Sequence, residues 1–379
     1  MYYLKLFENH SQYEAFEGGG GMLRPNVSHC ISENEVHYNP FSWAKEYLTF
    51  VALEDGDFRF TPRNGYAISY SIDNGKTWEA PASATHQTVP AGSKVMWKSA
   101  DITNTTNSTN GGLLKVHKGG IGTFTSTGHF EVQGNIMSLI SGDSFANADE
   151  LINGKGFDFL FQDCTGLTSA ENLILPATTL TNGCYDSMFQ DCTSLTTAPE
   201  LPATVLTDWC YSGMFCGCTN LTTAPELPAT TLVQGCYDSM FQDCTSLTTA
   251  PELPATTLAD SCYNYMFSNC TSLTVAPELP ATTLAQSCYN SMFQGCTSLE
   301  TAPELPATTL AEYCYNSIFR GCTNLNYIKC LATDISASDC TENWVSDVAS
   351  SGTFTKAVSM SSWTIGNNGI PTEWTVQDV

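Results

Sequence analysis

The sequence predicts a mainly β (α+β) protein, in which a small β-sandwich precedes a solenoid built from 26-residue units. Cysteines that recur at a constant step of 26 predict the solenoid. Short apolar or alternating runs, separated by Gly, Asn and Pro, predict the sandwich. With 379 residues and a hydrophobic fraction of 42%, the chain is long enough for two or three domains and is typical of ordered globular proteins.

Two columns of cysteines define the repeat, because each keeps the same step through six copies. The 184 column is Cys184, Cys210, Cys236, Cys262, Cys288 and Cys314, and the 192 column is Cys192, Cys218, Cys244, Cys270, Cys296 and Cys322. A degenerate copy with two extra residues precedes them around Phe161, Cys164 and Leu167. Since one unit is too small to bury a hydrophobic face alone, the units must stack, which predicts a right-handed solenoid of about seven coils.

Each unit reads CYxSMFQxCTSLTTAPELPATTL, and its apolar positions indicate which side chains face the core. The segment LTTA predicts a short strand of a parallel sheet, and CYDSMFQDC predicts a short helical turn on the opposite side of the coil. Pro199 and Pro202 limit the strand, because a proline removes a donor from the ladder. The positions expected to point inward are Met188, Phe189, Leu195, Ala198, Leu201 and Leu206.

The pattern F-x-x-C-x-x-L, followed by L-P and a further leucine, resembles the BspA-like family of leucine-rich repeats, which is abundant in surface proteins of gut Bacteroidetes. The resemblance covers about residues 157 to 330. It implies a leucine-rich-repeat solenoid that binds proteins or host surfaces and carries out no catalysis.

The flanking regions differ from the repeat in composition. Residues 46–142 hold the short runs of the predicted sandwich, and Ser71 to Trp78 (SIDNGKTW) resembles the Asp-box of sialidases. One Asp-box is a hairpin turn, and Arg59 and Arg63 are too few for a sialidase site. Residues 143–330 hold the solenoid, and residues 331–379 are expected to cap its last coil with Trp344, Trp363 and Trp374.

The first 45 residues contain the runs YLKLFENHSQYEAF, NVSHC and ENEVHYNP, and with these they resemble a leader segment of virion and prophage proteins of Bacteroidetes phages. The amino terminus lacks the basic start and apolar run of a signal peptide, and the chain has no apolar stretch of about 18 residues that could insert in a membrane. If Met1 is the true start, this fits a virion protein that folds in the host cytoplasm and contacts other virion proteins through its N-terminal region. A bacterial cell-surface location is the alternative, and a homo-oligomer is left open.

Composition disfavours several classes of function. The net charge of -24 opposes binding to nucleic acids and to anionic membranes. The six histidines all precede residue 130 and lack ligand spacing, while the acids recur identically from unit to unit. We therefore expect neither an enzyme, nor a metal site, nor a cofactor.

The regular spacing of the cysteines favours a structural role. The leading interpretation is that each thiol is a small buried apolar group that bonds to the backbone. Disulfides between the two columns and metal binding are the alternatives, and the odd count of 17 cysteines argues against a complete set of disulfides.

Two columns of surface residues are candidates for binding. They are Glu200, Glu226, Glu252, Glu278 and Glu304, and beside them Thr197, Thr223, Thr249, Val275 and Thr301. The glutamates either form a solvated face that opposes aggregation or provide a docking strip for a basic partner or cations. The sequence thus predicts a fibre, appendage or decoration subunit of a phage that contacts a host-surface protein or glycan through the solenoid, with a BspA-like surface adhesin as the alternative.

Overall fold

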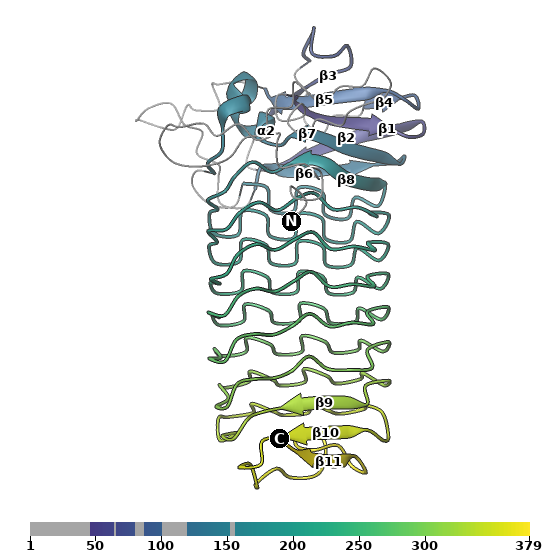
Figure 1. Ribbon diagram of the computed structural model, residues 1–379. Helices are drawn as coiled ribbons and strands as arrows, with labels where there is room; N and C mark the ends of the chain where they lie inside the picture. Colours follow the sequence, from purple (N-terminus) through teal and green to yellow (C-terminus); the bar gives the residue numbers. More distant parts are fainter. Residues whose placement is uncertain (1–45, 64–65, 80–86, 101–119, 152–155) are drawn as a thin grey trace, which may run out of the picture. The chain divides into compact units, whose positions relative to one another are not determined.

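The computed structural model describes residues 46–63, 66–79, 87–100, 120–151 and 156–379. All of them belong to one compact unit, Phe41–Val379. The expectations for residues 1–45 lie outside the described part of the chain. Figure 1 shows two sheets followed by a stack of coils.

The segment from residue 46 to 135 forms most of two sheets. The five-stranded sheet has the order β3-β5-β1-β7-β8, and the three-stranded sheet has the order β4-β2-β6. Strand β1 pairs antiparallel with β5 and β7, whereas β8 runs parallel to β7. The strands are β1 (Leu48–Ala52), β2 (Gly56–Pro62), β3 (Ile68–Ser71), β4 (Gln87–Val89), β5 (Lys94–Ser99), β6 (Gly122–Ser126), β7 (Phe130–Asn135) and β8 (Leu167–Ile174).

Aromatic side chains hold the two sheets against each other. The ring of Phe50 on β1 lies 5.3 Å from Phe58 on β2 and 4.8 Å from Phe124 on β6, measured between centroids. Trp97 on β5 lies 5.1 Å from Phe124 in an edge-to-face arrangement. All four rings are buried, so they combine apolar burial with the edge geometry that aromatic pairs prefer.

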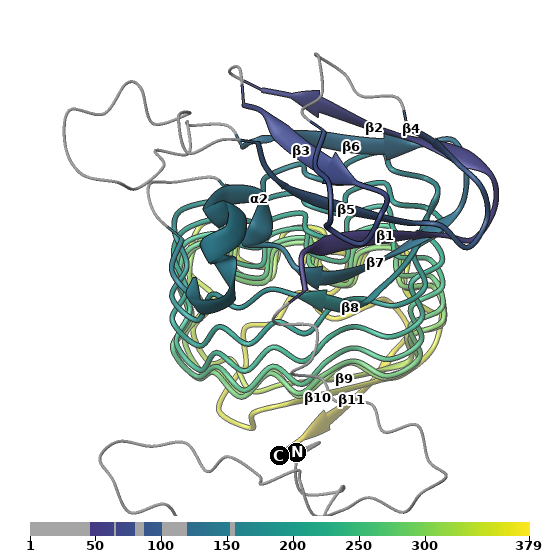
Figure 2. The same cartoon turned by 90° about the horizontal axis from the view of Figure 1, so that it is seen from above.

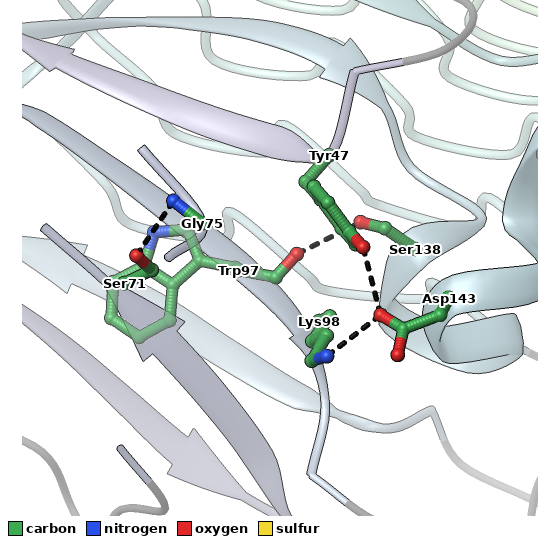
Figure 3. Close-up of polar contacts among 7 residues, drawn as sticks. All are labelled: Tyr47, Ser71, Gly75, Trp97, Lys98, Ser138 and Asp143. Atoms are coloured by element: carbon green, nitrogen blue, oxygen red, sulfur yellow. Dashed lines mark hydrogen bonds and ion pairs between the residues drawn. The ribbon is translucent and has the colours of Figure 1, made fainter. Parts of the chain in front are cut away.

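A polar network fastens the short helices to the five-stranded sheet. Helix α2 (Ser138–Ser141) and the 3-10 helix η5 (Gly142–Asn147) follow β7 directly. Asp143 accepts hydrogen bonds from the hydroxyl of Tyr47 (2.8 Å) and from Nζ of Lys98 (2.7 Å), as Figure 3 shows. The hydroxyl of Ser138 donates to the carbonyl oxygen of Trp97 (2.9 Å).

The Asp-box segment forms a turn between β3 and Glu79, which bridges back to Tyr70. Asp73 accepts hydrogen bonds from the backbone N–H groups of Lys76 and Thr77, at 3.0 and 2.9 Å. The N–H of Gly75 donates to the hydroxyl of Ser71 (2.9 Å). The hydroxyl of Thr77 also donates to Asp73 (2.6 Å), and this bond, together with the N–H of Thr77, holds the pKa of Asp73 well below its ordinary range.

The sheets and the coils share one core. Strand β8 belongs to the first coil, yet it completes the five-stranded sheet through its parallel pairing with β7. Buried side chains run without a break from β1 to Trp374. The five-stranded sheet therefore extends past residue 142, where the sequence analysis separates sandwich and solenoid.

Each coil has an extended side and a turn side. Figure 2, which looks along the stack, shows β8, β9 and β10 on one side and the turns on the opposite side. On the extended side, neighbouring coils pair through isolated parallel bridges such as Thr223↔Thr249. Pro199 and Pro202 explain why bridges replace strands here, because their nitrogens cannot donate to the next coil. Parallel strands return at the end of the stack as β9 (Tyr327–Cys330), β10 (Thr353–Lys356) and β11 (Thr375–Asp378).

The prediction of a helical turn for CYDSMFQDC is wrong. The segment is a run of β-turns in which alternate N–H groups point in different directions. The N–H of Met188 donates to Tyr185 within the coil (3.2 Å), whereas the N–H of Phe189 donates to Met214 of the next coil (2.9 Å). Ser187 and Asp191 have φ values of 54° and 59°, which a right-handed helix excludes. Pairing between coils replaces the helical hydrogen bonds.

The core of the stack consists of columns of identical side chains. Tyr185 and Tyr211 stack at 5.6 Å between ring centroids, and Phe189 and Phe215 stack at 5.4 Å. The corresponding rings of the later coils continue both columns. Of the six positions expected to face inward, five are buried and Ala198 is only partly buried.

The coil geometry continues past residue 330, where the sequence analysis places the end of the solenoid. The N–H of Tyr315 donates to Cys340 (3.0 Å), and the N–H of Gly321 donates to Ser346 (2.8 Å), as between earlier coils. Trp344 stacks on Tyr315 at 6.5 Å. A further coil therefore follows residue 330. Its sequence departs from the repeat, because Trp344 stands where earlier coils have Met or Ile.

Candidate functional site

The outward side chains of the extended side form a regular surface. Between Glu200 and Thr204 the burial alternates: Leu201 and Ala203 are buried, whereas Glu200, Pro202 and Thr204 are exposed. Such alternation is the pattern of a strand with one face on the core. We call the glutamates Glu200, Glu226, Glu252, Glu278 and Glu304 the acidic column, and all five are exposed.

The acidic column carries one internal counterion. Nζ of Lys329 lies 2.8 Å from Oε2 of Glu304, and this hydrogen bond raises the pKa of Lys329. No ion pair reaches the other four glutamates within the described part of the chain. Since parallel strands lie about 4.8 Å apart, the four carboxylates repeat at a spacing shorter than the Debye length of about 8 Å and repel one another.

In two columns of the turn side, neutral residues separate the acidic side chains of neighbouring coils. One exposed or partly exposed column there alternates amides and acids along the stack: Asn182, Asp208, Gln234, Asp260, Gln286 and Glu312. In a second column, Asp238 accepts hydrogen bonds from Nδ2 of Asn264 and from the hydroxyl of Ser239, both at 2.8 Å. These arrangements keep like charges in the two columns from occupying adjacent coils, which the acidic column does not.

The threonine column lies three residues before the acidic column on the same extended segment. Thr223, Thr249 and Thr301 are exposed, and Thr197 is partly exposed because its hydroxyl lies 2.7 Å from the hydroxyl of Ser169. Val275, at the same position, is 66% exposed. The structure therefore places both predicted columns on the surface of the extended side.

Both cysteine columns lie in the core. The twelve side chains are all buried, and in the 192 column each thiol donates a hydrogen bond to a phenylalanine carbonyl of the preceding coil. Burial raises the pKa of both types of thiol, for example of Cys210 and Cys322 to about 12. Among the sixteen cysteines that the structure describes, none is in a disulfide. These thiols pack and bond to the backbone, and they are poor nucleophiles.

Within the described ranges, no group of three or more His, Cys, Asp or Glu side chains could hold a metal ion. The helices of the same ranges are all too short or too polar to cross a bilayer.

Two features of the surface escaped the sequence analysis. Lys329 was not recognised as a partner of Glu304, because the two residues come from different coils and Lys329 replaces a proline of the repeat. The columns of Pro202 and Thr204 were also missed, although the alternation of polar and apolar residues from Glu200 onward contains the signal.

The geometry defines a repeat protein whose exposed side chains recur at a fixed spacing on one extended surface. The sequence supports a particular class of repeat. Residues 157–274 and 235–343 match the profile of the BspA type leucine rich repeat region, in six copies. The resemblance to BspA-like leucine-rich repeats is thereby confirmed for this part of the chain. A search of curated proteins found no significant match.

Proposed function

We propose that this chain is a non-enzymatic surface-binding protein, and that its acidic column docks a basic protein partner. The observation that carries the proposal is the contrast between the two sides of the coil. In two columns of the turn side neutral residues separate the acids, although Asp163 and Asp191 occupy adjacent coils there, whereas glutamates follow one another without interruption through five coils on the extended side. Repulsion within the column lowers stability, so an external positive partner would relieve it.

The cation beside the acidic column indicates the preferred chemistry of a partner. Lys329 already occupies the end of the column, where its ammonium group binds Glu304. A partner that presents lysines or arginines could make the same contact at Glu200, Glu226, Glu252 and Glu278. Each contact is weak because it is exposed, but contacts on one rigid surface act together.

Two biological settings are compatible with this proposal, a phage virion and a bacterial cell surface. A phage fibre, appendage or decoration subunit would use residues 1–45 to join other virion proteins and the repeats to contact the host surface. A BspA-like adhesin would display the same repeats on a bacterial cell. The BspA-type repeats support binding in either setting. Immunogold labelling of purified virions and of intact bacteria separates the two locations, because each alternative requires gold on only one of them.

Replacement of all five glutamates of the acidic column by glutamine tests the proposed function. Glutamine keeps the size and polarity of the side chain and removes the charge, so the fold should stay intact or gain slight stability. Attachment of the purified variant to host cells at physiological salt should fall well below that of the wild type. Unchanged attachment would leave the column as a solvated face and would favour a neutral ligand, such as a host glycan, elsewhere on the chain.

A further inference from the structure

The turn side carries a large aromatic side chain in an unfavourable backbone conformation. Trp209 has a φ of 59°, in the left-handed region that bulky residues rarely adopt. The same position is left-handed in six further coils, and most of these place Gly or Ser there: Gly183, Gly235, Ser261 and Ser287, with Tyr313 and Asp339 at the end. Glycine would fit position 209 without this strain, so the tryptophan places a large side chain where the backbone disfavours one.

The indole ring of Trp209 packs directly on the backbone of Gly235 in the next coil. A Cβ atom on Gly235 would collide with the six-membered ring of Trp209, since Cδ2 would lie only 2.7 Å away. The ring therefore occupies the space that a side chain at position 235 would need. In the preceding coil the same position is Gly183, so no side chain of this column covers the opposite side of the ring. The side chain of Trp209 is partly exposed.

The surroundings of this ring are negative. The residue before Trp209 is Asp208, and between Gly156 and Ile328 the chain has 16 acids and a single base, Arg320. Elsewhere in the chain a tryptophan has its own cation, because Nζ of Lys98 lies 4.3 Å from the ring centroid of Trp78. No cation–ring contact of this kind reaches Trp209 in the described residues. A cation for Trp209 would have to come from outside the repeats.

We propose that Trp209 is an aromatic seat for a cationic side chain, a lysine or arginine of a protein partner. Tryptophan gives the strongest cation–π interaction of the aromatic residues, and the neighbouring acids add attraction of the same sign. The seat lies on the turn side, whereas the acidic column lies on the extended side. The proposal for Trp209 and the proposal for the acidic column can therefore be tested independently.

The side-chain N–H resonances of the seven tryptophans, observed by NMR in the full chain, allow a direct test. Trp209→Gly assigns the resonance and should fold, because glycine suits the left-handed φ. The probes are acetyl-trimethyllysine amide, its neutral tert-butyl isostere and methyl β-glucoside. We expect saturable shifts of the Trp209 resonance with the cationic probe, and none with the two neutral probes.

Two variants distinguish a formed seat from an exposed ring. Gly235→Ala keeps Trp209 but removes the space under the ring, so it should weaken binding of the cationic probe about fivefold or more. Ser261→Gly alters the same column two coils away and should leave binding unchanged. The glutamine variant of the acidic column should also retain the shift. Equal shifts with the neutral isostere, a response to the glucoside alone, or no response to any probe would each overturn the proposal.

Discussion

Sγ of Cys218 donates a hydrogen bond to the carbonyl oxygen of Phe189 in the preceding coil, at 3.1 Å. The same bond recurs from Cys192 to Cys322 at 3.0 to 3.1 Å, so one thiol in each coil joins it to the coil before. The acceptor carbonyl also takes the N–H of a cysteine in its own coil, as Phe189 takes that of Cys192. The cysteine column therefore contributes both to the packing within the core and to the register between coils.

Loss of one such thiol should cost a measurable amount of stability. Cys244→Ala removes the donor to Phe215 without adding volume to the core, which should lower the free energy of unfolding by about 1 kcal/mol or more. Urea denaturation followed by circular dichroism measures the change. Cys216→Ala, at a partly exposed position, is the control. Equal losses in both variants would show that the thiol hydrogen bond contributes nothing.

Stability should decline at alkaline pH. Burial raises the pKa of Cys210 and Cys322 from 9.0 to about 12 in the folded protein. Unfolded thiols ionise near 9, so their contribution to stability is complete below pH 9 and is lost as the pH rises toward 12. Urea midpoints measured from pH 7 to 11 should be constant at first and then fall. A midpoint that stays constant to pH 11 would contradict the burial of the thiols.

Replacement of a left-handed glycine on the turn side by alanine should destabilise the protein. Gly213 has a φ of 59°, and a Cβ there would lie 2.9 Å from the hydroxyl of Ser187. We expect Gly213→Ala to destabilise the protein by about 1–2 kcal/mol. Gly156→Ala is the matched control, because Gly156 lies in open space without a positive φ. Thermal melting compares the two, and a larger loss for Gly156→Ala would contradict the turn geometry.

The Asp-box turn should depend on one carboxylate. Asp73→Ala removes the acceptor for the N–H groups of Lys76 and Thr77. Hydrogen–deuterium exchange of these two amides should become faster, while exchange in β1 should be unchanged because its partners are other strands. Unaltered exchange at Thr77 would mean that another group holds the turn.

The sequence predicts the stacking and the core well, and the local backbone less well. A constant step of 26 fixes which side chains form columns, so the burial of Phe189, Leu195 and Leu201 follows from periodicity. Periodicity does not reveal where the N–H groups point. The sequence predicts a helical turn around Met188, but pairing between coils directs alternate N–H groups to the carbonyls of the next coil.

The surface is less predictable than the core, because its properties depend on neighbours from different coils. The acidic column could be found from spacing alone. The contact of Glu304 with Lys329, and the seat of Trp209 on Gly235, require knowledge of which residues face each other across coils. The last coil was missed because Trp344 and Val348 stand where earlier units have Met or Ile and Cys.

A comparison of two variants that lose the same number of charges tests the central proposal most directly. One has the five glutamates of the acidic column replaced by glutamine, and the other has Asp186, Asp208, Asp238, Asp260 and Glu312 of the turn side replaced by the corresponding amides. Binding of an oligolysine peptide to each is measured by surface plasmon resonance at physiological ionic strength. We predict a large loss of affinity in the first variant and a small one in the second. Equal losses would mean that only net charge matters and would contradict a docking role for the acidic column.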